Sequence, residues 1–189
     1  MHMTPDLQLH VAAAVRGERP ALDGLVAAWL PVVVGWCTRL GGPSVDAEDA
    51  AHDVMMVVTR RIESVYHADR FPSWIFGVTR RTLARHRRRA FVARWVPGFV
   101  IDVADASDGP ARLYAISETT RNVQALLDRI NQEDREVLVL ALLEDRPDTE
   151  VAEMLGIPLG TMKSRLRRAR DRFLKLARAN NITPGGDAS

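Results

Sequence analysis

The chain has 189 residues, enough for two small domains, and its 47% apolar and 26% charged residues exclude wholesale disorder. Its formal charge is only +2, so any function that depends on charge must come from where the charges lie along the chain. The single cysteine, Cys37, excludes an internal disulfide and a cysteine-based zinc site, and its place on an apolar helical stripe favours a buried thiol.

No segment suggests export or membrane insertion. Residues 1–8 lack the basic region and apolar core of a secretory signal. The longest uncharged stretch, residues 24–38, has 15 residues, fewer than the roughly 18 to 20 that span a bilayer. We therefore expect a cytoplasmic protein.

Apolar residues at steps of three and four predict three helices in the first half of the chain. The first spans residues 22–40 and contains Pro31, which should kink it. A Gly-Gly-Pro break follows, and a second helix begins at Ser44 or Asp46. The third helix covers residues 72–89 and opens on a proline.

The helical pattern lapses in residues 96–120, where aspartates, glycines and prolines predict an extended acidic linker. Helical spacing resumes over residues 121–180, and the polar residues 181–189 are expected to form a disordered tail. No segment has the alternation of a strand. The sequence therefore predicts an all-α protein of two small helical domains, residues 1–95 and 121–180, joined by the linker.

Residues 149–166 have the pattern of a helix-turn-helix. Gly156 can end the first helix in the left-handed conformation, and Pro158 can begin the second. The second helix has an outer face of basic and hydroxyl side chains, which can donate to base edges and phosphates in a major groove. A solvated basic face would explain a basic run alone, but the turn pattern favours duplex DNA. The candidate residues are Thr161, Lys163, Ser164, Arg165, Arg167, Arg168 and Arg172, of which Arg165 and Arg172 are expected to bind phosphates.

An acidic stripe lies at the start of the second predicted helix. Asp46, Asp49 and Asp53 share one helical face, with Glu48 beside them. A solvated surface favoured by the helix dipole explains Asp46 and Glu48, but it explains Asp53 less well. A docking surface for a basic partner protein is the functional alternative. Metal binding is disfavoured, because carboxylates on one helix without a second ligand set rarely make a site.

The third predicted helix carries the opposite charge, with seven arginines and no acid in residues 80–94. Aromatic residues stand just before these arginines, and rings beside a cationic surface suit single-stranded DNA. The alternative is that these rings belong to the core, which we favour for Trp74, whereas Tyr66 is expected to be exposed. The candidate single-strand-binding residues are Tyr66, His67, Trp74, Arg80, Arg81, Arg85 and Arg88.

These features together resemble the extracytoplasmic-function sigma factors of bacterial RNA polymerase. Residues 46–54 (Asp-Ala-Glu-Asp-Ala-Ala-His-Asp-Val) resemble the start of the family's region 2.2, and residues 71–84 resemble region 2.3. Residues 134–138 and 156–170 resemble region 4, and the second of these is the most specific motif in the chain. Three features depart from the family's pattern: Arg81 replaces a frequent Asn, Val65 stands where an aromatic residue is often found, and Arg146-Pro147-Asp148 replaces a more usual Leu-Ser-Tyr.

The resemblance implies a partner for each surface. The acidic stripe would dock on the β′ clamp helices of core RNA polymerase, and the β flap would be a second contact. The loop at residues 65–70 and the third helix would bind the opened −10 element of promoter DNA. The final helix would recognise the duplex −35 element, while the linker would extend toward the polymerase active centre. An anti-sigma factor is a further expected partner.

Two other functions compete with this interpretation. A transcription regulator that never joins polymerase would use the same helix-turn-helix, but it would leave the acidic stripe and the arginine-rich helix without a role. An enzyme would need a phosphate-binding loop, paired metal ligands or a nucleophile with its base, and the sequence has none of these patterns. We therefore expect no catalysis, no cofactor and no metal.

Overall fold

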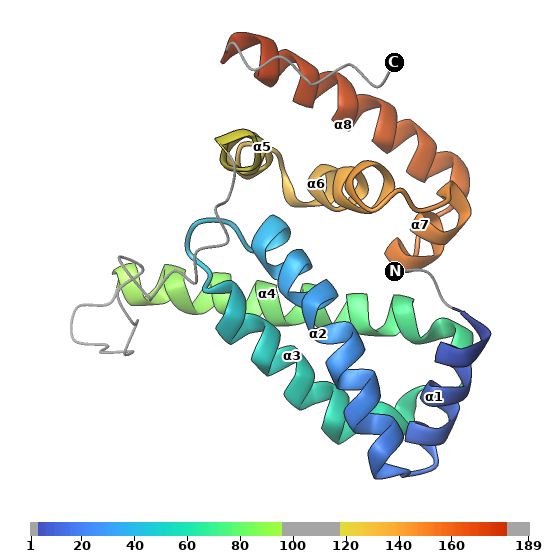
Figure 1. Cartoon of the computed structure of the whole chain (residues 1–189). Helices are drawn as coiled ribbons and strands as arrows, with labels where there is room; N and C mark the ends of the chain where they lie inside the picture. Colours follow the sequence, from blue (N-terminus) through green and yellow to red (C-terminus); the bar gives the residue numbers. More distant parts are fainter. Residues whose placement is uncertain (1–3, 96–117, 181–189) are drawn as a thin grey trace. The chain divides into compact units, whose positions relative to one another are not determined.

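The computed structural model describes residues 4–95 and 118–180, and every regular element in these two ranges is helical (Figure 1). The chain separates into two compact units, with the division between Ser107 and Asp108. The prediction of an all-α protein is confirmed. The first unit contains α1 (Pro5–Val15), α2 (Arg19–Gly41), α3 (Ala47–Arg61), η1 (Ile62–Ser64), η2 (Ala68–Arg70) and α4 (Phe71–Trp95). The second contains α5 (Glu118–Asp128), α6 (Gln132–Leu138), η3 (Val139–Leu143), α7 (Asp148–Leu155) and α8 (Leu159–Ala179).

The predicted limits of the linker and the tail stay predictions. Residues 96–117 of the predicted linker and residues 181–189 lie outside the described part of the chain. The last residues of the predicted linker belong to α5, which begins at Glu118.

The helix α1 is the element that the apolar spacing does not predict. Its start has a recognisable signal, because the Thr4 hydroxyl oxygen accepts a hydrogen bond from the Leu7 N–H at 3.3 Å and Pro5 occupies the first turn. Only Val11 and Ala14 are buried among its 11 residues, so its apolar stripe is too short to stand out. These residues pack α1 against α2, η1 and η2.

The core of the first unit forms where α2 meets α3 and α4; in Figure 1, α2 and α3 run beside each other and α4 crosses them. Trp29 and Trp36 of α2 are fully buried with Phe71 and Phe76 of α4. The ring centroids of Trp29 and Phe71 are 5.2 Å apart, and those of Trp36 and Phe76 are 5.0 Å apart. Both pairs are edge-to-face, the arrangement that the quadrupoles of aromatic rings favour.

By length and composition, α2 is the one helix in the described ranges that could cross a membrane, with a mean hydropathy of 1.5. It continues past Pro31, which lies on its exposed side. Its apolar stripe is covered by neighbouring helices, since Trp29, Val33, Trp36 and Leu40 have no exposed surface. One side of α2 is therefore part of the core of the first unit.

In the second unit, α7 and α8 form the helix-turn-helix that the sequence predicts. Gly156 ends α7 in the left-handed region with φ of 67°, and its N–H donates to the Glu153 carbonyl at 3.0 Å. Met162 and Ala169 lie seven residues apart on the inner side of α8, and both side chains are fully buried. The loop before α7 is held by a buried guanidinium, because Arg146 pairs with Glu144 at 2.8 Å and with Glu150 of α7.

We expect Trp36→Ala to lower the free energy of unfolding by about 3–5 kcal/mol, because the ring is fully buried between aromatic neighbours. Leu9→Ala is the control, since Leu9 is 70% exposed and its truncation should cost less than about 0.5 kcal/mol. Urea unfolding followed by far-UV circular dichroism compares the two variants. Equal losses would contradict this account of the core.

Candidate functional site

The outer face of α8 presents most of the residues predicted to bind duplex DNA. Thr161, Lys163, Ser164, Arg167 and Arg168 are all exposed. The Ser164 hydroxyl donates to the Thr161 carbonyl at 2.9 Å, and the Lys163 ammonium lies 3.8 Å from the Asp148 carboxylate. Arg167 and Arg168 lie on the exposed side of α8, and Met162 and Ala169 on its other side are buried.

The other two predicted residues of α8, Arg165 and Arg172, occupy the flank that faces α6. Arg165 pairs with Glu133 at 3.0 Å, and Arg172 pairs with Asp134 at 2.7 Å. The side chain of Arg165 is only 20% exposed, whereas that of Arg172 is 52% exposed. Both pairs join α8 to the first turn of α6, so a phosphate would have to compete with a carboxylate for either arginine.

The acidic stripe begins at the N-terminus of α3. The Asp46 carboxylate accepts hydrogen bonds from the N–H groups of Glu48 and Asp49, both at 2.9 Å, which makes Asp46 the N-cap. Asp46, Glu48 and Asp49 are exposed, as a docking surface requires. Their negative charge also lies where the positive end of the helix dipole stabilises it.

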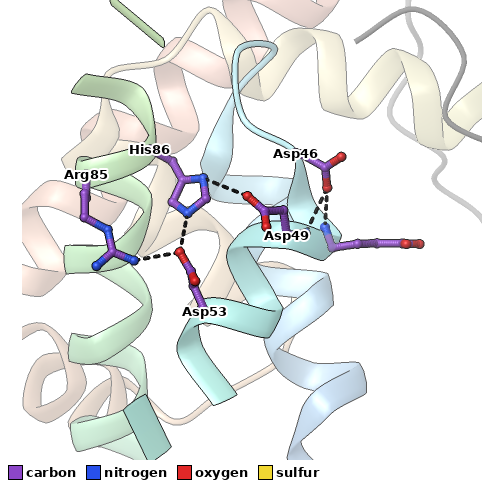
Figure 2. A network of polar contacts seen from close by, with 6 residues as sticks. Asp46, Asp49, Asp53, Arg85 and His86 are labelled. Carbon is purple, nitrogen blue, oxygen red and sulfur yellow. Dashed lines mark hydrogen bonds and ion pairs between the residues drawn. The ribbon is translucent and has the colours of Figure 1, made fainter. Parts of the chain in front are cut away.

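Asp53 differs from the rest of the stripe because it faces α4 (Figure 2). One carboxylate oxygen of Asp53 lies 2.7 Å from Arg85 Nη2 and 2.9 Å from His86 Nε2. On its other side, the His86 ring has Nδ1 3.7 Å from the Asp49 carboxylate. The structure thus joins a residue predicted to dock on polymerase to a residue predicted to bind single-stranded DNA.

Opposing effects act on the pKa of Asp53. Partial burial raises the pKa, but the hydrogen bond from His86 and the positive charges of Arg85 and His86 together lower it below the ordinary carboxyl value. Asp53 is therefore ionised at neutral pH and neutralises part of the charge on α4.

A basic groove of about 500 Å³ runs between α3 and α4. Of the predicted single-strand-binding residues, Trp74, Arg81 and Arg85 line it. Two arginines from the last turn of α3, Arg60 and Arg61, complete the lining, and the sequence analysis did not select them. The sequence shows that basic residues end the helix that the aspartates begin, but no local pattern places them beside α4. The remaining lining residues are Val57, Ser64, Val78 and Thr82.

Trp74 links this groove to the core. Its ring is half-buried and stacks on the buried Phe71 with centroids 5.8 Å apart and an interplanar angle of 29°. One face of the Trp74 ring therefore packs on the core, as expected, and the residue also lines the groove.

The other four predicted single-strand-binding residues are not among the residues that line the groove. Tyr66, in the turn between η1 and η2, is 91% exposed, as expected, and His67 beside it is exposed too. On α4, Arg88 is exposed and Arg80 is half-buried. Tyr66 and His67 are therefore accessible to a ligand without movement of the helices.

A second, apolar groove of about 530 Å³ lies between α2 and α3. Leu30 and Met56 are its exposed apolar side chains, and Glu48 and His52 add polar groups.

Within the described residues, no group of three His, Cys, Asp or Glu side chains could hold a metal ion. Burial raises the pKa of the Cys37 thiol to about 12, so this buried cysteine is protonated at neutral pH.

Comparison with known proteins identifies the two units. Residues 25–91 match the family model of Sigma-70 region 2, and residues 120–173 match that of Sigma-70, region 4. The ECF RNA polymerase sigma factor SigM of Mycobacterium tuberculosis is 30% identical over 175 residues, which cover 93% of this chain and 86% of SigM. The chain belongs to the extracytoplasmic-function (ECF) sigma factors. It therefore binds core RNA polymerase and directs promoter-specific transcription initiation.

Other relatives of this sigma factor agree. The ECF sigma factor SigW of Bacillus subtilis is 24% identical, with 86% of this chain and 92% of SigW covered. SigE of Mycolicibacterium smegmatis is 30% identical, and the match covers 86% of this chain but 63% of SigE. A solved structure of CnrH in complex with the cytosolic domain of CnrY has the same fold, with a TM-score of 0.63, 21% identity, and 92% and 97% of the two chains covered.

We expect Asp53→Asn to destabilise the sigma factor by about 1 kcal/mol or less at neutral pH, as for other partly exposed ion pairs. Because folding lowers the pKa of Asp53, its stabilisation is present above the carboxyl pKa of the unfolded chain and is lost as pH falls through the lower, folded value. The difference in Tm between the parent protein and the variant should therefore be constant above about pH 5 and shrink as the pH falls below that value. A difference that does not change with pH would contradict this assignment.

Proposed function

We propose that this sigma factor recognises the two promoter elements through two separate basic surfaces. The exposed face of α8 would bind the duplex −35 element, with Lys163, Ser164, Arg167 and Arg168 at or near base edges. The basic groove, together with Tyr66 and His67, would bind the opened −10 element as a single strand. The observation that carries this proposal is a groove with four arginines beside a half-exposed tryptophan, in the same chain as a basic helix-turn-helix.

Core polymerase would bind the acidic side of the first unit. Asp46, Glu48 and Asp49 form an exposed acidic start to α3, which suits basic groups on the β′ clamp helices. Asp53 would join them at the edge facing α4. The β flap would be a further contact of the sigma factor, and residues 96–117 would extend toward the active centre.

The remaining expectations are part of the same proposal. The sigma factors are non-catalytic initiation factors, and we propose that this chain has no catalysis of its own. It would act in the cytoplasm, where core polymerase is found. An anti-sigma factor would restrain it, an idea supported by the structural neighbour CnrH, which was solved in complex with the cytosolic domain of CnrY.

A pull-down with core polymerase and a run-off transcription assay test the proposal together. Wild-type protein should bind core enzyme and produce transcripts from the promoter of its own gene. Reversing two charges, with Asp49→Lys and Asp53→Lys, should weaken core binding at least tenfold, because like charges would then face the clamp helices. A chain that binds duplex DNA but not core polymerase would instead be a regulator of another class.

The −35 assignment has its own test on α8. Arg168→Ala should reduce the preference for a matched over a scrambled −35 element by about 1–3 kcal/mol, because a base contact is lost. Arg172→Ala should weaken binding evenly across sequences, since Arg172 pairs with Asp134 and would touch at most a phosphate. Gel-shift titrations with both DNA duplexes measure this, and equal loss of preference in the two variants would refute the division.

A further inference from the structure

Arg85 is part of both the basic groove and the ion pair with Asp53. It lines the basic groove, and its Nη2 atom lies 2.7 Å from the Asp53 carboxylate (Figure 2). The Arg85 side chain is 55% exposed, so a ligand in the groove can reach it. Its guanidinium is nevertheless turned toward α3 by a negative charge within the same unit.

We propose that Asp53 is an internal competitor of single-stranded DNA, because it holds Arg85 in an ion pair that a strand phosphate must displace. This inference rests on the proposed function of the basic groove and adds a restraint to it. A phosphate and a carboxylate are alternative acceptors for the same guanidinium donor, so a strand phosphate that takes the Nη2 donor of Arg85 must displace Asp53.

The restraint is selective among the four groove arginines. Within residues 4–95 and 118–180, Arg85 pairs with Asp53, while no acidic side chain pairs with Arg60, Arg61 or Arg81. Three of the groove arginines can thus bind a strand phosphate without breaking an ion pair within the described residues, whereas Arg85 cannot. His86 donates to the same oxygen of Asp53 at 2.9 Å, which keeps the carboxylate oriented toward α4.

The size of the effect follows from the exposure of the pair. An ion pair at a surface contributes little, which corresponds to a difference of about two- to fivefold in binding. Asp53 would therefore weaken the affinity of the groove for any strand without blocking it. Since Asp53 also belongs to the proposed docking face, a basic group of polymerase that binds Asp53 would free Arg85 for the strand.

The experiment measures binding of the full chain to a fluorescent single-stranded oligonucleotide by anisotropy at several salt concentrations. Asp53→Asn should raise the affinity by about two- to fivefold. It should also steepen the slope of log K against log salt by about 0.7, because one more phosphate is neutralised. Glu63→Gln is the matched control, since it removes the same charge from the exposed, neighbouring η1 without disturbing the partner of Arg85.

A double-mutant cycle separates the ion pair from general charge. In the background of Arg85→Gln, the substitution Asp53→Asn should no longer steepen the salt dependence. A gain that persists in that background, or one equal to that of Glu63→Gln, would overturn the competition.

Arg81→Gln tests the groove itself. If it weakens strand binding while Asp53→Asn acts like the control, only the proposed competition fails. If Arg60→Gln and Arg81→Gln both leave binding unchanged, the groove is not the strand site and both proposals fail.

Discussion

The packing of α2 against α3 and α4 determines where every charged group of the first unit lies. Trp29 and Trp36 of α2 are fully buried against Phe71 and Phe76 of α4. The helix α3 adds its own buried residues to the core of this unit, so close packing leaves little freedom for the two helices that carry the charges. Because α3 and α4 are held in contact, Asp53 of one helix meets Arg85 and His86 of the other. The Asp53 pair and the basic groove are both consequences of this apolar contact.

The second unit has an aliphatic core, to which buried ion pairs are added. Arg146 has no exposed side-chain surface and lies between Glu144 and Glu150, and the Arg135 guanidinium pairs with Asp128 at 3.2 Å. Such pairs tolerate burial only with good geometry, because both ions lose their hydration. The Arg146 pairs hold the loop before α7, and the Arg135 pair joins α6 to the end of α5. The flank pairs of Arg165 and Arg172 join α8 to α6, while Arg167 and Arg168 remain exposed.

Much of this arrangement could be predicted from the sequence, where the signals are local. The helix-turn-helix followed from Gly156 and Pro158, and the acidic cap of α3 followed from Asp46. The helix α1 was missed because only two of its residues are buried, although Thr4 and Pro5 mark its start. The contribution of Arg60 and Arg61 to the groove could not be predicted, because it depends on α4 lying beside the end of α3.

The sequence by itself determined the helical class, the two kinds of charged surface and the family, because periodicity and motifs are properties of neighbouring residues. Only the tertiary structure decided which charges meet. Asp53 and Arg85 are 32 positions apart, and Asp134 and Arg172 are 38 apart, so no local pattern pairs them. The acidic stripe and the arginine-rich helix, which are separate features of the sequence, therefore share one ion pair in the folded protein.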